Sequence, residues 1–114
     1  MAMTPDKLLS AVSLCRKAGK LVTGFDAVQE SLYDNKAVLV FCAADLSANT
    51  RKRVDRFCEK VGAQAFTAPL TQAALEQVCP KRTGVFAVTD QGLARLVRDQ
   101  LAAETNNLET EGNA

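Results

Sequence analysis

The continuous apolar run at residues 37–43, AVLVFCA, is the feature that most constrains how this chain can fold. A strand with one face in water alternates apolar and polar residues, and this run does not alternate. Both of its faces must therefore be covered, so we expect a central strand between two layers of helices. The run is also far shorter than the roughly 20 apolar residues that a membrane-spanning helix needs.

Three shorter strand patterns and five amphipathic helix patterns flank that run. We expect strands at Leu21–Thr23, Gln64–Ala68 and Gly84–Thr89. We expect helices at about residues 4–18, 25–35, 48–61, 72–79 and 91–101, with N-caps at Ser47, Thr71 and Asp90 and helix ends at Gly19, Asn35 and Gly62. Alternating strands and helices predict parallel βαβ crossovers. The predicted fold class is α/β, a three-layer α/β/α sandwich with a small, mostly parallel (mixed) sheet of about four strands.

Length and charge indicate one mildly basic domain. We expect this domain over residues 1–103 and a disordered acidic tail over residues 104–114, where Leu108 is the one large apolar residue. All 14 basic residues and 10 of the 13 acidic residues precede residue 104, so the domain carries 14 minus 10, or +4. That charge favours an acidic partner, and it also serves solubility. The N-terminus lacks a secretory pattern, so we expect a cytoplasmic protein with no membrane partner.

The residues needed for most enzyme chemistry are missing from this sequence. It has no histidine, no CxxC pair and no glycine-rich nucleotide motif, so we predict no enzyme, no cofactor and no metal site. The four cysteines lie among apolar neighbours and are interpreted as buried free thiols, Cys79 with the least support. The polar turns at Asp45 with Asn49 and at Asp90 with Gln91 could line a small-molecule cleft, but helix caps are the simpler interpretation.

Two clusters of basic residues could bind an anion. Gly24 opens the second predicted helix close to Arg16, Lys17 and Lys20, and a helix start offers unpaired N–H groups to a phosphate. A plain helix boundary would explain the same residues. The second cluster contains Arg51, Lys52, Arg53 and Arg56. Pairs of Arg51 with Asp55 and of Arg56 with Glu59 favour a solvated helix face, and a phosphate-contacting patch is the alternative.

Three segments of the chain carry a family resemblance. The runs AGKLVTGFDAVQ, NKAVLVFCAADLSANTRKRV and CPKRTGVFAVTD resemble the kink-turn RNA-binding ribosomal protein superfamily of L7Ae and L30e, and its bacterial YlxQ-like branch most of all. The resemblance spans about Leu8 to Val97. It implies an α/β/α sandwich that binds sharply bent RNA and catalyses nothing.

The resemblance also implies which residues contact RNA. They lie at the start of the second helix and in the loop before the last strand: Gly24, Phe25, Asp26, Ala27 and Glu30, and Pro80, Lys81, Arg82 and Thr83. We add Lys20, which flanks the glycine. Where strong RNA binders of the family carry Asn or Lys, Glu or Gln, and then Lys, this chain has Asp26, Ala27 and Glu30. A solvated face is the alternative interpretation of these two acids.

The function that we predict is recognition of structured ribosomal or other noncoding RNA, mainly by shape and by phosphate contacts, without DNA binding. Sparse aromatic residues, five Phe and one Tyr, argue against a broad platform for single strands. The alternative is a protein-interaction module, or a weak homo-oligomer such as a dimer, of the same fold that has lost kink-turn binding. The acids at Asp26 and Glu30 point to this alternative.

Overall fold

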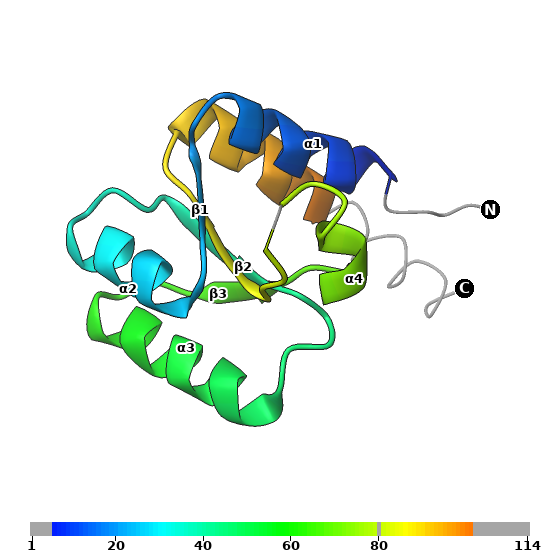
Figure 1. Cartoon of the computed structure of the whole chain (residues 1–114). Coiled ribbons are helices and arrows are strands. Elements are labelled where there is room, and N and C mark those ends of the chain that lie inside the picture. The colour runs from blue at the N-terminus through cyan, green and yellow to red at the C-terminus, as the bar shows by residue number, and fades with distance from the viewer. Residues whose placement is uncertain (1–5, 80, 102–114) are drawn as a thin grey trace, which may run out of the picture.

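Four strands form one mixed sheet in the computed structural model, which describes residues 6–79 and 81–101 (Figure 1). The strands are β1 (Leu21–Thr23), β2 (Leu39–Cys42), β3 (Ala65–Thr67) and β4 (Val85–Val88). The helices are α1 (Asp6–Lys17), α2 (Phe25–Tyr33), α3 (Ala48–Lys60), α4 (Gln72–Leu75) and a helix described over residues 91–101. Every predicted strand and helix is present, and α4 is shorter than the predicted helix at residues 72–79. The predicted start of the first helix at residues 4–5 and the predicted tail at residues 104–114 lie outside the described residues.

The strand order is β1-β4-β2-β3, and β4 runs against both of its neighbours. Because β2 and β3 are parallel, three of the four strands point the same way. The predicted class, a three-layer α/β sandwich with a mixed four-stranded sheet, is confirmed. The prediction that all crossovers are parallel is wrong for β4. β4 starts at the end of the sheet where β2 and β3 finish, as its antiparallel pairing with β2 requires.

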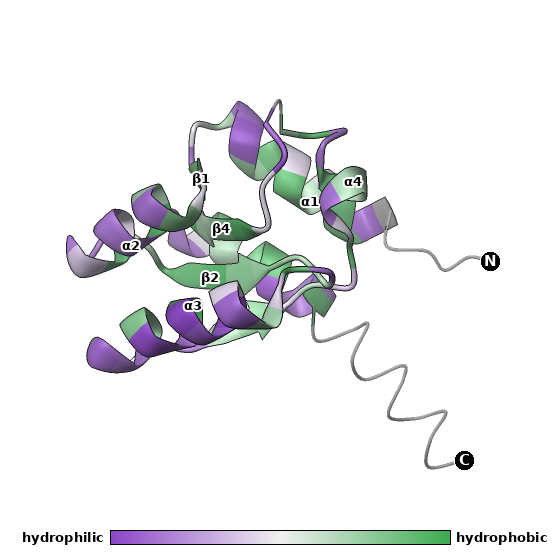
Figure 2. Ribbon diagram, turned by 60° about the horizontal axis from the view of Figure 1, so that its bottom comes forward, coloured by the Kyte–Doolittle hydropathy of each residue, from purple (hydrophilic) through white to green (hydrophobic). Residues whose placement is uncertain are grey.

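Alternate residues of the two central strands pack into two separate cores. Phe41 and Phe86 stack with ring centroids 5.1 Å apart, in the core beneath α1 and helix 91–101. Val40 and Val85 enter the other core, which α2 and α3 cover. Figure 1 shows these helix pairs on opposite sides of the sheet, and in Figure 2 β2 and β4 are hydrophobic along their length. All four residues of β2 are buried, which confirms that the apolar run forms a strand covered on both faces.

The helix boundaries follow local signals in the sequence. Ser47 accepts a hydrogen bond from the N–H of Thr50, Thr71 from that of Ala74, and Asp90 from that of Leu93, as predicted for N-caps. Helices α1, α2 and α3 are each followed by one residue of positive φ: Gly19 at 71°, Asn35 at 62° and Gly62 at 72°. This left-handed conformation lets the next amide turn back to the helix, so these ends also agree with the prediction.

Candidate nucleic-acid interface

One end of the sheet gathers loops from four distant parts of the chain. Strands β1, β2 and β3 finish there and β4 begins there. We call it the loop end and define it by segments 23–27, 43–47, 68–72 and 81–84. The opposite end, with segments 17–20, 34–37 and 61–64, is called the turn end. The loop end contains the first turn of α2 and the predicted basic loop.

Gly24 holds the start of α2 against the start of β4. Its N–H donates a 2.9 Å hydrogen bond to the carbonyl oxygen of Val85. Its φ of 100° and ψ of 148° suit glycine alone, although no atom lies within 4 Å of the place that a Cβ would occupy. Gly24, the N-cap residue, has no side chain that could cap α2, so the first amide N–H groups of this helix are available to an anion. The helix start and the basic loop therefore share one side of the molecule.

The basic loop carries two exposed cations. Lys81 and Arg82 are both exposed, and Nη1 of Arg82 lies 3.8 Å from Oε2 of Glu76. Thr83 is turned inward, with its hydroxyl oxygen accepting the N–H of Val85 at 3.4 Å. Pro80, the first predicted residue of this loop, lies outside the described residues. Lys81 has no ion-pair partner among residues 6–79 and 81–101, whereas Arg82 has a distant one in Glu76.

The two polar turns with Asp45 and Asp90 act as helix caps. Asp45 Oδ1 accepts the N–H of Gln72 at 2.9 Å, and Asp90 Oδ2 accepts that of Leu93 at 2.9 Å. Asp45 follows β2, whereas Gln72 is the first residue of α4, so this hydrogen bond joins two segments of the loop end. These contacts favour caps over a small-molecule cleft at the same positions.

The remaining predicted residues of α2 lie on its exposed surface. Asp26, Ala27 and Glu30 are exposed, and neither acid forms an ion pair with any residue of segments 6–79 and 81–101. Ala27 and Glu30 line a groove of about 670 Å³ that follows α2 to the turn end, where exposed Lys20 also lines it. Lys20 lies at the opposite end of β1 from Gly24, so the structure does not bring together the basic cluster predicted at that helix start. The predicted site therefore has two parts, the loop end and this groove, which extends from the middle of α2 to the turn end. Both the solvated-face and the RNA-contact interpretation of the acids require such exposure.

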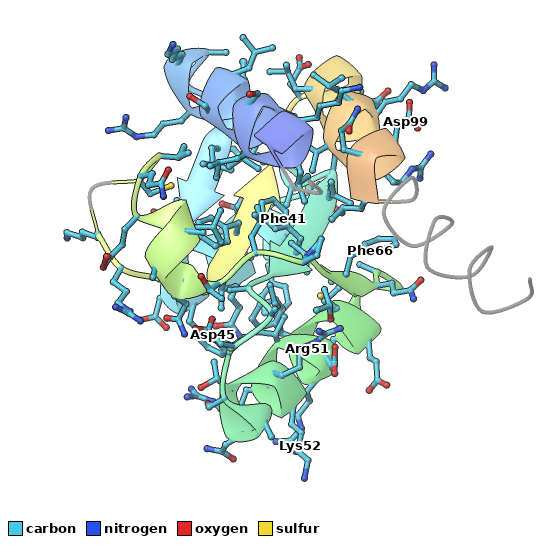
Figure 3. All side chains as sticks on the ribbon, turned by 90° about the vertical axis from the view of Figure 1, so that its right-hand side faces the viewer. Phe41, Asp45, Arg51, Lys52, Phe66 and Asp99 are labelled. Atoms are coloured by element: carbon cyan, nitrogen blue, oxygen red, sulfur yellow. The ribbon has the colours of Figure 1, made fainter. Side chains whose placement is uncertain are left out.

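The arginine cluster of α3 is divided between internal and surface roles. Arg51 points toward β3, the strand of Phe66, whereas Lys52 points away from the sheet (Figure 3). Arg51 Nε pairs with Asp55 at 3.1 Å, Nη2 donates to the carbonyl oxygen of Ala65 at 2.9 Å, and Nη1 donates to the Thr67 hydroxyl. The predicted pair of Arg51 with Asp55 is confirmed. The predicted pair of Arg56 with Glu59 does not form: the two ion pairs of the described residues involve Arg51 and Arg82 instead.

Arg53 makes a contact with Phe25 that sequence analysis missed. Its guanidinium carbon lies 4.3 Å from the centroid of the Phe25 ring. Phe25 is partly buried and meets Phe57 edge to face, with ring centroids 5.2 Å apart. Since Phe25 and Arg53 belong to different helices, no spacing rule could have paired them.

The cysteines offer no reactive group. All four are free and buried, as predicted. Burial raises the pKa of the Cys15, Cys42 and Cys58 thiols to about 11 and also raises that of Cys79, so they stay protonated near neutral pH. Within the described part of the chain, no group of three His, Cys, Asp or Glu side chains could hold a metal ion. No helix there is long and apolar enough to span a membrane.

Comparison with known proteins adds the family. The chain is 30% identical over 93 residues to the RNA-binding protein YlxQ of Enterococcus faecium, covering 82% of this chain and 89% of that protein. A protein of unknown function from Bacillus halodurans shares the fold with a TM-score of 0.77 at 23% identity, over 84% of this chain and 97% of that one. The Giardia lamblia 15.5kD RNA binding protein also shares the fold, with a TM-score of 0.69 at 20% identity, over 90% of this chain and 89% of that one.

A family profile matches most of the folded chain. It is that of the ribosomal protein L7Ae/L30e/S12e/Gadd45 family, and the match covers residues 6–98. The profile and the YlxQ relative together confirm the resemblance found in the sequence. This chain belongs to the ribosomal protein L7Ae/L30e/S12e/Gadd45 family and, within it, to the YlxQ-like branch.

Proposed function

We propose that this protein binds structured RNA at its loop end and catalyses no reaction. The relative from Enterococcus faecium is named an RNA-binding protein, which supports this function. The observation that carries the proposal is the hydrogen bond from Gly24 to Val85, because it joins the uncapped start of α2 to the strand that follows Lys81 and Arg82. An uncapped helix start beside two cations suits a bent RNA backbone, where phosphates crowd together.

Recognition rests mainly on shape and on phosphate contacts. The residues that we assign to it are Lys20, Gly24, Phe25, Asp26, Ala27, Glu30, Pro80, Lys81, Arg82 and Thr83. Asp26 and Glu30 are acceptors and repel phosphate, so they contribute less binding energy than basic or amide side chains would. A kink-turn is the RNA element that we favour, bound in the cytoplasm and without a cofactor.

The test removes the two cations of the basic loop. Lys81→Ala with Arg82→Ala should weaken binding to a kink-turn RNA by about 10- to 100-fold and reduce the log–log salt slope by about 1.5. Filter binding at several salt concentrations measures both quantities. The matched control is Lys60→Ala with Arg95→Ala, which removes the same charge from exposed positions of α3 and helix 91–101 that are not assigned to RNA binding.

Two results would refute parts of this proposal. Equal losses in the two double variants would mean that only net charge matters, and the loop end would not be the binding site. Equal affinity for a DNA of the same sequence would exclude specificity for RNA. Crosslinking in cells, followed by sequencing of the attached RNA, identifies the natural target.

A protein-interaction module is the second candidate function. Leu14 and Leu96 are large apolar side chains with exposed fractions of 48% and 37%, and they line a groove of about 340 Å³ between α1 and helix 91–101. An apolar groove on a helical surface suits a protein partner or a second copy of the chain. Mass measurement by light scattering and a pull-down with and without ribonuclease distinguish this candidate from RNA binding.

A further inference from the structure

The Arg53 side chain packs on an aromatic ring and forms no ion pair with any residue that the structure describes. Only two ion pairs occur within residues 6–79 and 81–101, and they involve Arg51 and Arg82. Arg53 is exposed, with one side of its guanidinium group against the Phe25 ring at 4.3 Å. The contact with Phe25 limits the freedom of this long side chain before any ligand arrives.

The ring beneath Arg53 is itself fixed in position. Phe25 packs edge to face against Phe57, which is 2% exposed and belongs to the core under α2 and α3. Phe25 is also the first residue of α2 and directly follows Gly24. The guanidinium group therefore lies beside the helix start that is hydrogen-bonded to Val85. A phosphate at that helix start would bring its neighbouring base close to Arg53.

We propose that Arg53, supported by Phe25, stacks on one unpaired base of the bound RNA at the start of α2. This inference rests on the proposed function, since it assumes that RNA occupies the loop end. Arginine planes stack on splayed-out RNA bases, and such a contact tolerates any base because every base has a π-face. It would add binding energy where Asp26 and Glu30 supply little.

The experiment separates the plane of Arg53 from its charge. We measure the affinity of wild-type protein for three RNAs: a kink-turn, a hairpin with an unpaired bulge, and a single strand. The tightest complex is then measured again with Arg53→Lys, which keeps the charge and removes the plane. We expect a loss of about tenfold. Arg56→Lys is the matched control, because Arg56 is exposed on the same helix with no ring contact in the described residues, and it should bind like wild type.

A second readout reports stacking directly. The same RNA carries 2-aminopurine at each unpaired position in turn, and protein binding should change the fluorescence at one position. Arg53→Lys should abolish that change, and an abasic nucleotide at that position should make wild type and Arg53→Lys bind equally well. Phe25→Leu keeps an apolar side chain against Phe57 and should weaken binding as Arg53→Lys does, with its folding checked by circular dichroism.

The possible outcomes distinguish this inference from the proposed function. If wild type binds none of the three RNAs, both fail. If wild type binds and Arg53→Lys binds equally well, or loses no more than Arg56→Lys, the stacking contact is refuted and RNA binding remains. A tenfold loss that persists on the abasic RNA would also refute it, because the base would then play no part.

Discussion

The loop end and the turn end of the sheet are built from different kinds of contact. At the turn end, the amides of Lys20, Lys36 and Ala63 each bond to a carbonyl five residues earlier in the helix just finished. At the loop end, the bonds join segments far apart in sequence: Gly24 to Val85, Ala43 to Gly84, Ala44 to Leu70 and Gln72 to Asp45. Local sequence therefore specifies the three helix ends at the turn end, although the Lys20 carbonyl oxygen there also accepts the N–H of distant Thr89 at 2.9 Å. The contacts of the loop end require the whole fold. We expect substitutions at the loop end to lower both stability and RNA binding, and a substitution at Gly62, which lies at the turn end outside the groove lined by Lys20, to lower stability alone.

The largest effect should come from Gly84, where three loops of the loop end meet. Gly84 is buried, and a Cβ added there would lie 2.7 Å from Leu46 Cδ1 and 3.3 Å from Gln72 Cδ. Gly84→Val should lower the free energy of unfolding by about 2 to 3 kcal/mol through overpacking. It should also weaken RNA binding, because the basic loop must shift. Urea denaturation and filter binding measure the two effects.

Gly92 provides the control for this substitution. It is exposed in the first turn of helix 91–101, and the nearest atom to an added Cβ is a carboxylate oxygen of Asp90 at 3.3 Å. Gly92→Val should change the free energy of unfolding by less than about 1 kcal/mol. If Gly84→Val were as stable as wild type, the three loops could separate at little cost. The contacts between distant segments would then not hold the loop end together.

The next effect should come from Gly62 at the turn end, and it should be confined to stability. Gly62 has a φ of 72° and open space around the position of a Cβ. Gly62→Ala should therefore lower the free energy of unfolding by about 1 to 2 kcal/mol through backbone strain alone. Gly62→Asn should be less harmful, since Asn35 adopts the same conformation after α2. RNA affinity should not change when it is measured without urea, where the variant is folded. A loss of affinity would mean that Gly62 affects the binding site as well as stability.

The same division explains what could be predicted from the sequence. The caps at Ser47 and Thr71 and the helix ends at Gly19 and Gly62 depend on a few neighbouring residues, and all of them were predicted. The buried β2 strand was predicted because an unbroken apolar run has few alternatives.

The missed features all depend on partners distant in sequence. The direction of β4 is set by its pairing with β1 and β2, both of which lie far from it in sequence. The contact of Arg53 with Phe25 depends on how α3 packs against α2. Within the candidate site, the family resemblance supplied the residues, and only the structure placed Gly24 beside the basic loop.

The smallest effect on stability should come from removing either of the two caps of α4. The first turn of α4 has a local cap, Thr71, which accepts the N–H of Ala74 at 3.1 Å, and a distant cap, Asp45, which accepts the N–H of Gln72 at 2.9 Å. Thr71→Ala and Asp45→Ala each remove one acceptor from an exposed helix start, so each should cost about 1 kcal/mol of stability. The Gln72 side chain also donates to the Asp45 carbonyl oxygen at 3.4 Å, and that bond remains in both variants. Of the two caps, only Asp45 belongs to the segment after β2, and α4 leads into the basic loop. Asp45→Ala should therefore weaken RNA binding and Thr71→Ala should not.

The charge of Asp45 must be separated from its role as a cap. Removing a carboxylate from the loop end would by itself favour RNA, which opposes the expected loss. Asp45→Asn removes the charge but keeps an oxygen that can accept the N–H of Gln72, so it should bind RNA at least as well as wild type. Equal RNA affinities for Asp45→Ala and Thr71→Ala, each measured on folded protein, would show that the distant cap does not position the basic loop. In that case the bonds of Gly24 to Val85 and of Ala43 to Gly84 would hold the loop end together without α4.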